Sequence, residues 1–153
     1  MRILHSRLAL VLMALLLAFG LSASAQGIQD PTTWKFSIAP QKDGSYMLKA
    51  EVQIAAKWHI YAMEPGGEGE LIGTSFKMDA GAASLVGKMK ELTPAKHEVM
   101  MDEHVSVYAG EASFAGKLSG KRGQKISGSV EYQACNDMMC LPPKTKSFTL
   151  TLP

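Results

Sequence analysis

The sequence has few cysteines, no excess charge after its first 25 residues and no long apolar run beyond them. Its two cysteines among 153 residues allow at most one intramolecular disulfide. Arg2 and Arg7 account for the net charge of +2, so residues 26–153 hold 14 basic and 14 acidic side chains. Without net positive charge or a dense basic cluster, nucleic acid and anionic lipid are not expected partners. No later stretch approaches the ~18 consecutive apolar residues of a membrane span.

The first 25 residues have the features of a secretory signal peptide. Arg2 and Arg7 form a basic start, Leu8 to Gly20 is an apolar stretch of 13 residues, and Ala23-Ser24-Ala25 fits a cleavage site. The apolar stretch is short for a membrane anchor, which is the alternative reading. We therefore expect an exported protein whose mature part, residues 26–153, forms a single domain in an oxidising compartment.

The apolar residues of the mature part mostly alternate with polar ones. This period of two is typical of half-buried strands and runs through Trp34–Ile38, Tyr46–Ile54, Val105–Val107, Ala112–Gly116, Ile126–Tyr132 and Phe148–Leu152. Turn residues, among them Lys42-Asp43-Gly44 and Pro142-Pro143, separate the runs. Several short strands with such turns predict an all-β antiparallel sandwich or barrel. Only Ala82–Leu92 is ambiguous between strand and helix, and Gly87 weakens the helical reading.

The two cysteines, Cys135 and Cys140, lie between the last two predicted strands. A hairpin there would bring them within disulfide distance, and an oxidising compartment favours the bond. Closing so short a loop stabilises the fold by only about 2 kcal/mol in the chain-entropy model. A bridge between near neighbours can also open without unfolding the sheet. A redox role and a purely structural role both remain open on these grounds.

Other readings of the pair are weaker. The spacing is C-x4-C rather than C-x-x-C, and no strand–helix pattern follows it, which argues against a thioredoxin-type site. Zinc would need further ligands from His59, His97 and His104, none of which has ligand spacing to the pair. Copper(I) would suit the methionine pairs Met100-Met101 and Met138-Met139, although such pairs more often line flexible apolar surfaces. We therefore expect no metal and no cofactor.

The segment around the cysteines resembles the N-terminal periplasmic domain of the thiol:disulfide interchange protein DsbD family. The resemblance is carried by Tyr132-Gln133-Ala134-Cys135 followed by Cys140-Leu141-Pro142-Pro143, and more weakly by Trp58-His59-Ile60-Tyr61 with the glycines after Pro65. It covers most of residues 30–153. It implies an immunoglobulin-like antiparallel β-sandwich in the periplasm.

The resemblance also implies roles for the cysteines. Cys140 would form the mixed disulfide with a partner, and Cys135 would resolve it. The expected partners are thioredoxin-like periplasmic oxidoreductases, serving cytochrome c biogenesis or disulfide correction, and a membrane or thioredoxin-like electron donor.

A cap loop would cover the pair, and Val99–His104 corresponds to it. Met100 and Met101 would provide the shield, Asp102 and Glu103 would be the acidic residues near the site, and Tyr61 and His59 would line it.

The sequence departs from the family pattern at three points. The cysteines are one residue closer than in the best-known members, and the cap has methionines where an aromatic residue is usual. The membrane and thioredoxin-like domains are not in the sequence, so we expect electrons to arrive from a separate protein. The sequence thus predicts an electron carrier that acts as a thiol:disulfide oxidoreductase. The alternative is a secreted β-sandwich binding module with a structural disulfide.

Overall fold

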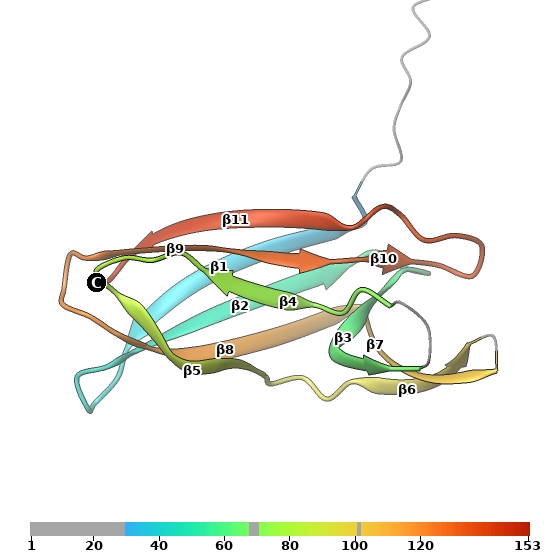
Figure 1. Ribbon diagram of the computed structural model, residues 1–153, viewed down its shortest axis with the longest axis horizontal. Helices are drawn as coiled ribbons and strands as arrows, with labels where there is room; N and C mark the ends of the chain where they lie inside the picture. Colours follow the sequence, from blue (N-terminus) through green and yellow to red (C-terminus); the bar gives the residue numbers. More distant parts are fainter. Residues whose placement is uncertain (1–29, 68–70, 101) are drawn as a thin grey trace, which may run out of the picture.

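The computed structural model describes residues 30–67, 71–100 and 102–153 (Figure 1). The expected signal peptide and Met101 lie outside these residues. Throughout the described part of the chain the regular structure is β, in strands β1 (Thr32–Pro40), β2 (Tyr46–Ile54), β3 (His59–Gly66), β4 (Ser75–Met78), β5 (Ser84–Glu91), β6 (Lys96–Met100), β7 (Glu103–Ala109), β8 (Glu111–Ser119), β9 (Lys125–Tyr132), β10 (Ala134–Cys135) and β11 (Lys144–Thr151). Within the same ranges, no helix is long and apolar enough to cross a membrane.

The strands form three antiparallel sheets with the orders β1-β2-β8-β5, β11-β9-β4 and β10-β3-β7-β6. In Figure 1, β9 and β4 are drawn in front of the fainter β1 and β2, with β11 above them and β8 and β5 below. The sheet that contains β3, β7 and β6 lies at the end where β10 is drawn. Gln133 alone separates β9 from β10, so one continuous segment joins the second sheet to the third. This architecture confirms the predicted antiparallel β-sandwich.

The core lies between the layers and follows the predicted alternation. Tyr46, Leu48, Ala50, Val52 and Ile54 of β2 are all buried, while the residues between them are half-buried or exposed. Aromatic rings link the sheets across the core: Phe36 of β1 stacks on Phe148 of β11 with centroids 4.4 Å apart, and Phe76 meets Phe114 at 5.2 Å.

The ambiguous stretch 82–92 is a strand, and its helix-like spacing has a local cause. Between Val86 and Lys90 the pairing of β5 with β8 shifts register, and Gly87 has a φ of 81° there. The extra residues allow both Leu85 and Met89 to cover Gly116 of β8, where a Cβ atom would lie 2.5 Å from each side chain. The register shift therefore interrupts the alternation that a regular β-strand would show, which explains the helix-like spacing.

In the third sheet, β3 has buried residues on both of its faces. Ile60 of β3 is paired with Tyr108 of β7 and Ala134 of β10, and these three side chains belong to the main core. The next residue, Tyr61, faces the other way and forms a separate apolar cluster with Val105, Val107 and Cys135. Because strand residues alternate between faces, one face of this sheet helps to hold the sandwich together and the other is available for the candidate site.

Candidate redox site

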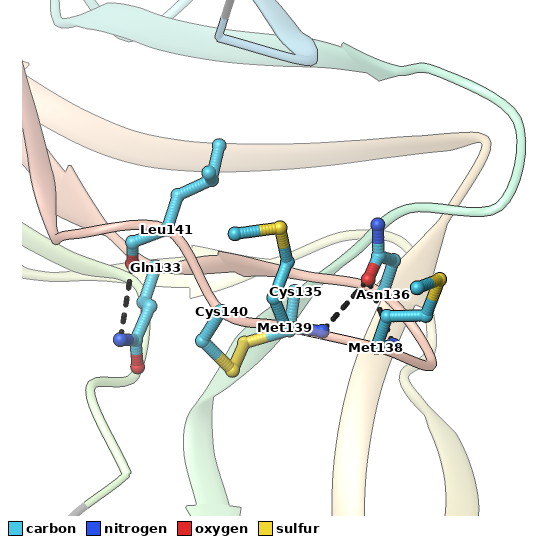
Figure 2. Close-up of a disulfide and its surroundings, with 7 residues drawn as sticks. All are labelled: Gln133, Cys135, Asn136, Met138, Met139, Cys140 and Leu141. Carbon is cyan, nitrogen blue, oxygen red and sulfur yellow. Dashed lines mark hydrogen bonds between the residues drawn. A yellow bond between two sulfur atoms is a disulfide. The ribbon is translucent and has the colours of Figure 1, made fainter. Parts of the chain in front are cut away.

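The two cysteines close a disulfide at the base of a tight loop. Their Cα atoms are 4.0 Å apart and the two residues form an isolated antiparallel bridge, as the predicted hairpin requires. The side chain of Asn136 organises the loop, because its Oδ1 accepts hydrogen bonds from the backbone N–H groups of Met138 and Met139, each at 2.9 Å (Figure 2). The backbone N–H of Asn136 also donates to the carbonyl of Met139. The loop thus has a hydrogen-bonded framework besides the disulfide.

The segment after Cys140 is fastened to the strand before Cys135. The N–H of Leu141 donates to the carbonyl of Ala134 at 2.9 Å, and Nε2 of Gln133 donates to the carbonyl of Leu141 at 3.2 Å. Figure 2 shows the Leu141 side chain on the opposite side of the chain from the disulfide, and this side chain is buried in the main core. Both ends of the cysteine loop are therefore anchored by groups other than sulfur.

The two cysteines differ in exposure. Cys135 lies on β10 with only 2% of its surface accessible, whereas Cys140 is exposed. A protein partner can therefore reach the bridge from the side of Cys140. This asymmetry agrees with the attacking role that the resemblance implies for Cys140, although the roles themselves stay predictions.

A hollow of about 230 Å³ lies against the disulfide and collects most of the expected site residues. Its lining comprises His59, Tyr61, Leu71, Met100, Glu103, Val105, Cys135, Asn136 and Cys140. His59 and Tyr61 come from β3, Glu103 and Val105 from β7, and Met100 from the end of β6. Six residues were expected around the cysteines. His59, Tyr61, Met100 and Glu103 line the hollow, and Met101 lies outside the described residues, which leaves one exception.

The exception is Asp102, which is exposed and does not line the hollow. It occupies the turn of the β6–β7 hairpin with a φ of 67°, in the left-handed region that aspartate tolerates better than most residues. Met100 is half-buried and packs against the Tyr61–Cys135 cluster. Met100 at the end of β6 therefore places a thioether against the cluster that contains the buried cysteine, while Met101 lies outside the described residues.

Gly67 lies close to Glu103, and Leu71 lines the hollow. Gly66 and Gly67 have φ values of 74° and 77°, and a Cβ atom on Gly67 would lie 2.7 Å from Oε2 of Glu103. Glycine at position 67 therefore permits this close approach of the loop to Glu103. Leu71 follows on the same loop and also packs against the cluster.

Burial shapes the protonation of the two aromatic side chains beside the pair. It lowers the pKa of His59 below its ordinary value of 6.5, against the opposing charges of Glu98 and Asp137. It raises the pKa of the Tyr61 hydroxyl. Both side chains are therefore neutral at pH 7.

The lysines after the cysteines differ in their surroundings. Nζ of Lys146 lies 3.1 Å from the Asp30 carboxylate, which partly neutralises its charge. Lys144 lines a second hollow, of about 350 Å³, with Met139, Leu141, Pro142 and Pro143. Lys144 is thus placed close to the residues that flank Cys140, while Lys146 is engaged elsewhere.

Of the three histidines considered as zinc ligands, His59 lines the hollow with the cysteines, whereas His97 and His104 do not. His97 and His104 are exposed, and Nδ1 of His97 lies 3.0 Å from the hydroxyl of Ser106. In the ranges that the model describes, no three His, Cys, Asp or Glu side chains form a group that could hold a metal ion.

Sequence reasoning missed three lining residues. Leu71 carries no local pattern that points to the site. Val105 was recognised as a strand residue, but alternation alone does not tell which of two buried faces it joins. Asn136 sits between the cysteines, and its tendency to hydrogen-bond the backbone two residues further on is the one feature that indicates its role.

Comparison with known proteins agrees with this geometry. The family model described as "Thiol:disulfide interchange protein DsbD, N-terminal" matches residues 24–152. A search of the curated proteins gives no significant match.

Three solved structures share the fold. The N-terminal periplasmic domain of ScsB from Proteus mirabilis has 19% identity and a TM-score of 0.59; the match covers 81% of this chain and 47% of that one, so this chain spans about half its length. The reduced DsbD N-terminal domain of Neisseria meningitidis has 17% identity and a TM-score of 0.57, with 80% and 91% of the two chains covered. A structure of the complex between the DsbD and PilB N-terminal domains from the same organism has 16% identity and a TM-score of 0.50, with 76% and 80% covered.

The immunoglobulin-like sandwich is therefore the shared fold, and this chain has a cysteine pair at disulfide distance within it. From the match over nearly the whole described sequence, the chain belongs to the family of N-terminal domains of the thiol:disulfide interchange protein DsbD.

Proposed function

We propose that this protein carries electrons in the periplasm by opening and closing the Cys135–Cys140 disulfide. It takes electrons from a separate reductant protein and passes them to oxidised, thioredoxin-like partners. Residues 1–25 direct export and are then removed, and neither metal nor cofactor takes part. The observation that carries the proposal is the pairing of a buried with an exposed cysteine in a loop that is anchored independently of the bridge.

Transfer to a partner proceeds in two exchange steps. The thiolate of Cys140 attacks one sulfur of the partner's disulfide, and the other partner sulfur leaves as a thiolate. Cys135 then loses its proton and attacks Sγ of Cys140, which closes the bridge and releases the second partner sulfur. Two electrons and two protons have then moved to the partner. Recharging by the donor runs the same steps in reverse.

The kind of partner is suggested by the exposed surroundings of Cys140. Met138 and Met139 are exposed beside it, and Pro142 and Pro143 follow on the same side of the loop. Proline has no N–H to donate and methionine adapts its shape, so this rim suits an apolar protein surface. One related structure is a complex of a DsbD N-terminal domain with the PilB N-terminal domain.

The test is to trap the mixed disulfide. Cys135→Ser leaves Cys140 exposed and removes the resolving thiol, so partners should accumulate as adducts on non-reducing gels of periplasmic extract. Cys140→Ser is the matched control, because Cys135 is buried and should capture little. If the Cys135→Ser variant captures nothing while a small alkylating reagent still labels its Cys140, the relay is wrong.

A redox titration separates the relay from a structural bridge. A structural disulfide has a potential below about −300 mV, whereas a carrier lies higher. A potential below that limit would favour the binding module instead.

A further inference from the structure

Transfer through this pair poses a proton problem that the fold must solve. Cys135 is almost completely buried, and its neighbours Tyr61, Val105 and Val107 form an apolar cluster. Apolar burial keeps a reduced thiol protonated, but only the thiolate attacks a disulfide. Because only 2% of the surface of Cys135 is accessible, its proton needs an acceptor within the hollow before the resolving step.

His59 lies directly opposite Cys135. The two residues are paired in the register of β3 with β10, and side chains of such a pair stand on one face of the sheet with Cβ atoms about 4.5–5.5 Å apart. Both residues also line the hollow that contains Cys140. The imidazole is therefore next to the atom that must lose a proton.

The imidazole of His59 has a nitrogen that can accept a proton. Its Nε2 atom is buried and has no hydrogen-bond partner among the described residues, which is unusual for a buried polar atom in a folded protein. The ring of Tyr61 packs edge-on against the imidazole ring, with the two ring centroids 5.7 Å apart, and holds the imidazole in place. A thiol at position 135 of the reduced protein would give this nitrogen the partner that it lacks in the closed-disulfide structure.

Glu103 is the other ionisable acceptor in the hollow, and it is less well placed. It lies on β7, which β3 separates from β10. Ala109 is the β7 residue in the row of His59 and Cys135, and Glu103 is six residues away from it along the strand. Glu103 also makes an interaction of its own.

The geometry points to His59 as the proton acceptor for Cys135 in the resolving step. This inference rests on the proposed relay. Nε2 takes the proton from Sγ of Cys135 as that sulfur attacks Sγ of Cys140. The partner's sulfur leaves as a thiolate, and the imidazolium then returns the proton to it or to water, since the ring as a whole is only half-buried. No oxidant or reductant beyond the partner's disulfide is needed.

The charges around His59 fit this cycle. Burial lowers its pKa, so the ring is neutral and ready to accept a proton near pH 7. Glu98 on β6 and Asp137 in the cysteine loop act in the opposite direction, and Glu103 lines the same hollow. These carboxylates stabilise the imidazolium during its short life, while neither Ala109 nor Cys135 in the flanking strands adds a charge.

The test separates the two exchange steps with a small probe. The fully reduced full-length mature protein is mixed with an aromatic disulfide that releases a coloured thiolate. The first equivalent of colour reports attack by Cys140 and depends on reagent concentration, whereas the second reports resolution by Cys135 and does not. In His59→Phe we expect the first phase to stay within about twofold and the second to slow about 100-fold at pH 7, the lower range for loss of a general base.

The pH profile distinguishes proton transfer from a structural role. The wild-type second phase should already be level at pH 7, because burial keeps the pKa of His59 below its ordinary value. In His59→Phe it should keep rising about tenfold per pH unit, because hydroxide must remove the proton. His59→Gln keeps a polar side chain without basicity and should be as slow as His59→Phe. His97→Phe makes the same change at an exposed site on β6 and should behave as wild type.

Three results would overturn the assignment: an unchanged second phase in His59→Phe, restoration of the rate by glutamine, or equal slowing of both phases. Colour release by the wild type needs no natural partner. Failure of the relay in cells would therefore appear in the trapping experiment and leave this readout intact.

Discussion

Reducing the disulfide should leave the sandwich folded and lower its free energy of unfolding by about 2 kcal/mol. The bridge spans a sequence separation of 5, so it closes a loop of six residues. In the chain-entropy model such a loop contributes about 2.2 kcal/mol at 25 °C, all of it through the unfolded chain. The folded loop keeps the hydrogen bonds of Asn136, and Leu141 stays bonded to Ala134. The native state therefore loses little when the sulfurs part.

The measurement is urea unfolding of the oxidised and the reduced protein. With a slope of about 2 kcal/mol per molar, the midpoint should fall by about 1 M and the slope should stay the same. The double variant Cys135→Ala/Cys140→Ala is the control, because reductant should not move its midpoint. The same free energy has a second readout. By linkage, folding should lower the potential of the bridge by about 43 mV relative to a peptide of residues 130–145.

Two outcomes would refute this reasoning. A loss of more than about 4 kcal/mol on reduction would mean that the disulfide supports native packing and not only the unfolded-state entropy. A larger urea slope or a second transition would mean that one redox state is not cooperatively folded. Either result would argue against a carrier, because a carrier must be folded in both states.

Three further predictions concern the surroundings of the site. Tyr132→Phe removes the 2.6 Å hydrogen bond to Asp30 and the one accepted from Thr32, and it should cost about 1–3 kcal/mol in urea unfolding. Burial opposes ionisation of Asp30, but hydrogen bonds from Tyr132 and Thr32 outweigh it and lower its pKa. Asp30 should therefore stabilise the fold above about pH 4 and lose that contribution as the pH falls through the folded-state pKa, a loss that Asp30→Asn should not show. Met100→Ala opens the hollow and should speed reduction of the bridge by a small thiol several-fold, whereas Val99→Ala, at a 64% exposed neighbour, should not.

The alternating pattern predicted those strands that have one face on the core and the other towards solvent. In β2, β8 and β9 buried residues alternate with more exposed ones almost throughout, so the sequence carries the period directly. The alternating pattern did not predict β3, because Ile60, Tyr61 and Ala62 are all buried. A strand between two apolar environments has no polar face to reveal its period.

The alternating pattern also did not predict the strands with few buried residues, for the opposite reason. Four of the five residues of β6 are exposed, so its sequence has no apolar face to repeat. In β5 the shift near Gly87 breaks the alternation. Both strands are held by pairing with a neighbouring strand. β5 pairs with β8, which is distant in sequence, and β6 pairs with β7 across a short turn.

The chemistry of the site was readable locally, but its shape was not. Cys135 and Cys140 are near neighbours in sequence, so their bond follows from compartment and spacing. The hollow joins side chains from residue 59 to residue 140, and only the strand order brings them together. Asp102 and Glu103 show the limit of resemblance: the two are adjacent and both acidic, yet Glu103 lines the hollow and Asp102 is exposed in the hairpin turn.

The two faces of β3 allow stability and reactivity to vary separately. Ile60 and Ala62 pack into the main core, so their truncation should reduce stability through lost burial. His59 and Tyr61 line the hollow beside the buried cysteine, so substitutions there should change its polarity and access. Because the cysteine loop is also tied to β10 by its own backbone hydrogen bonds, a change of redox state need not be transmitted through β3 to the core. A domain built in this way can alter its potential by substitutions at 59 and 61 while the sandwich that presents the site stays the same.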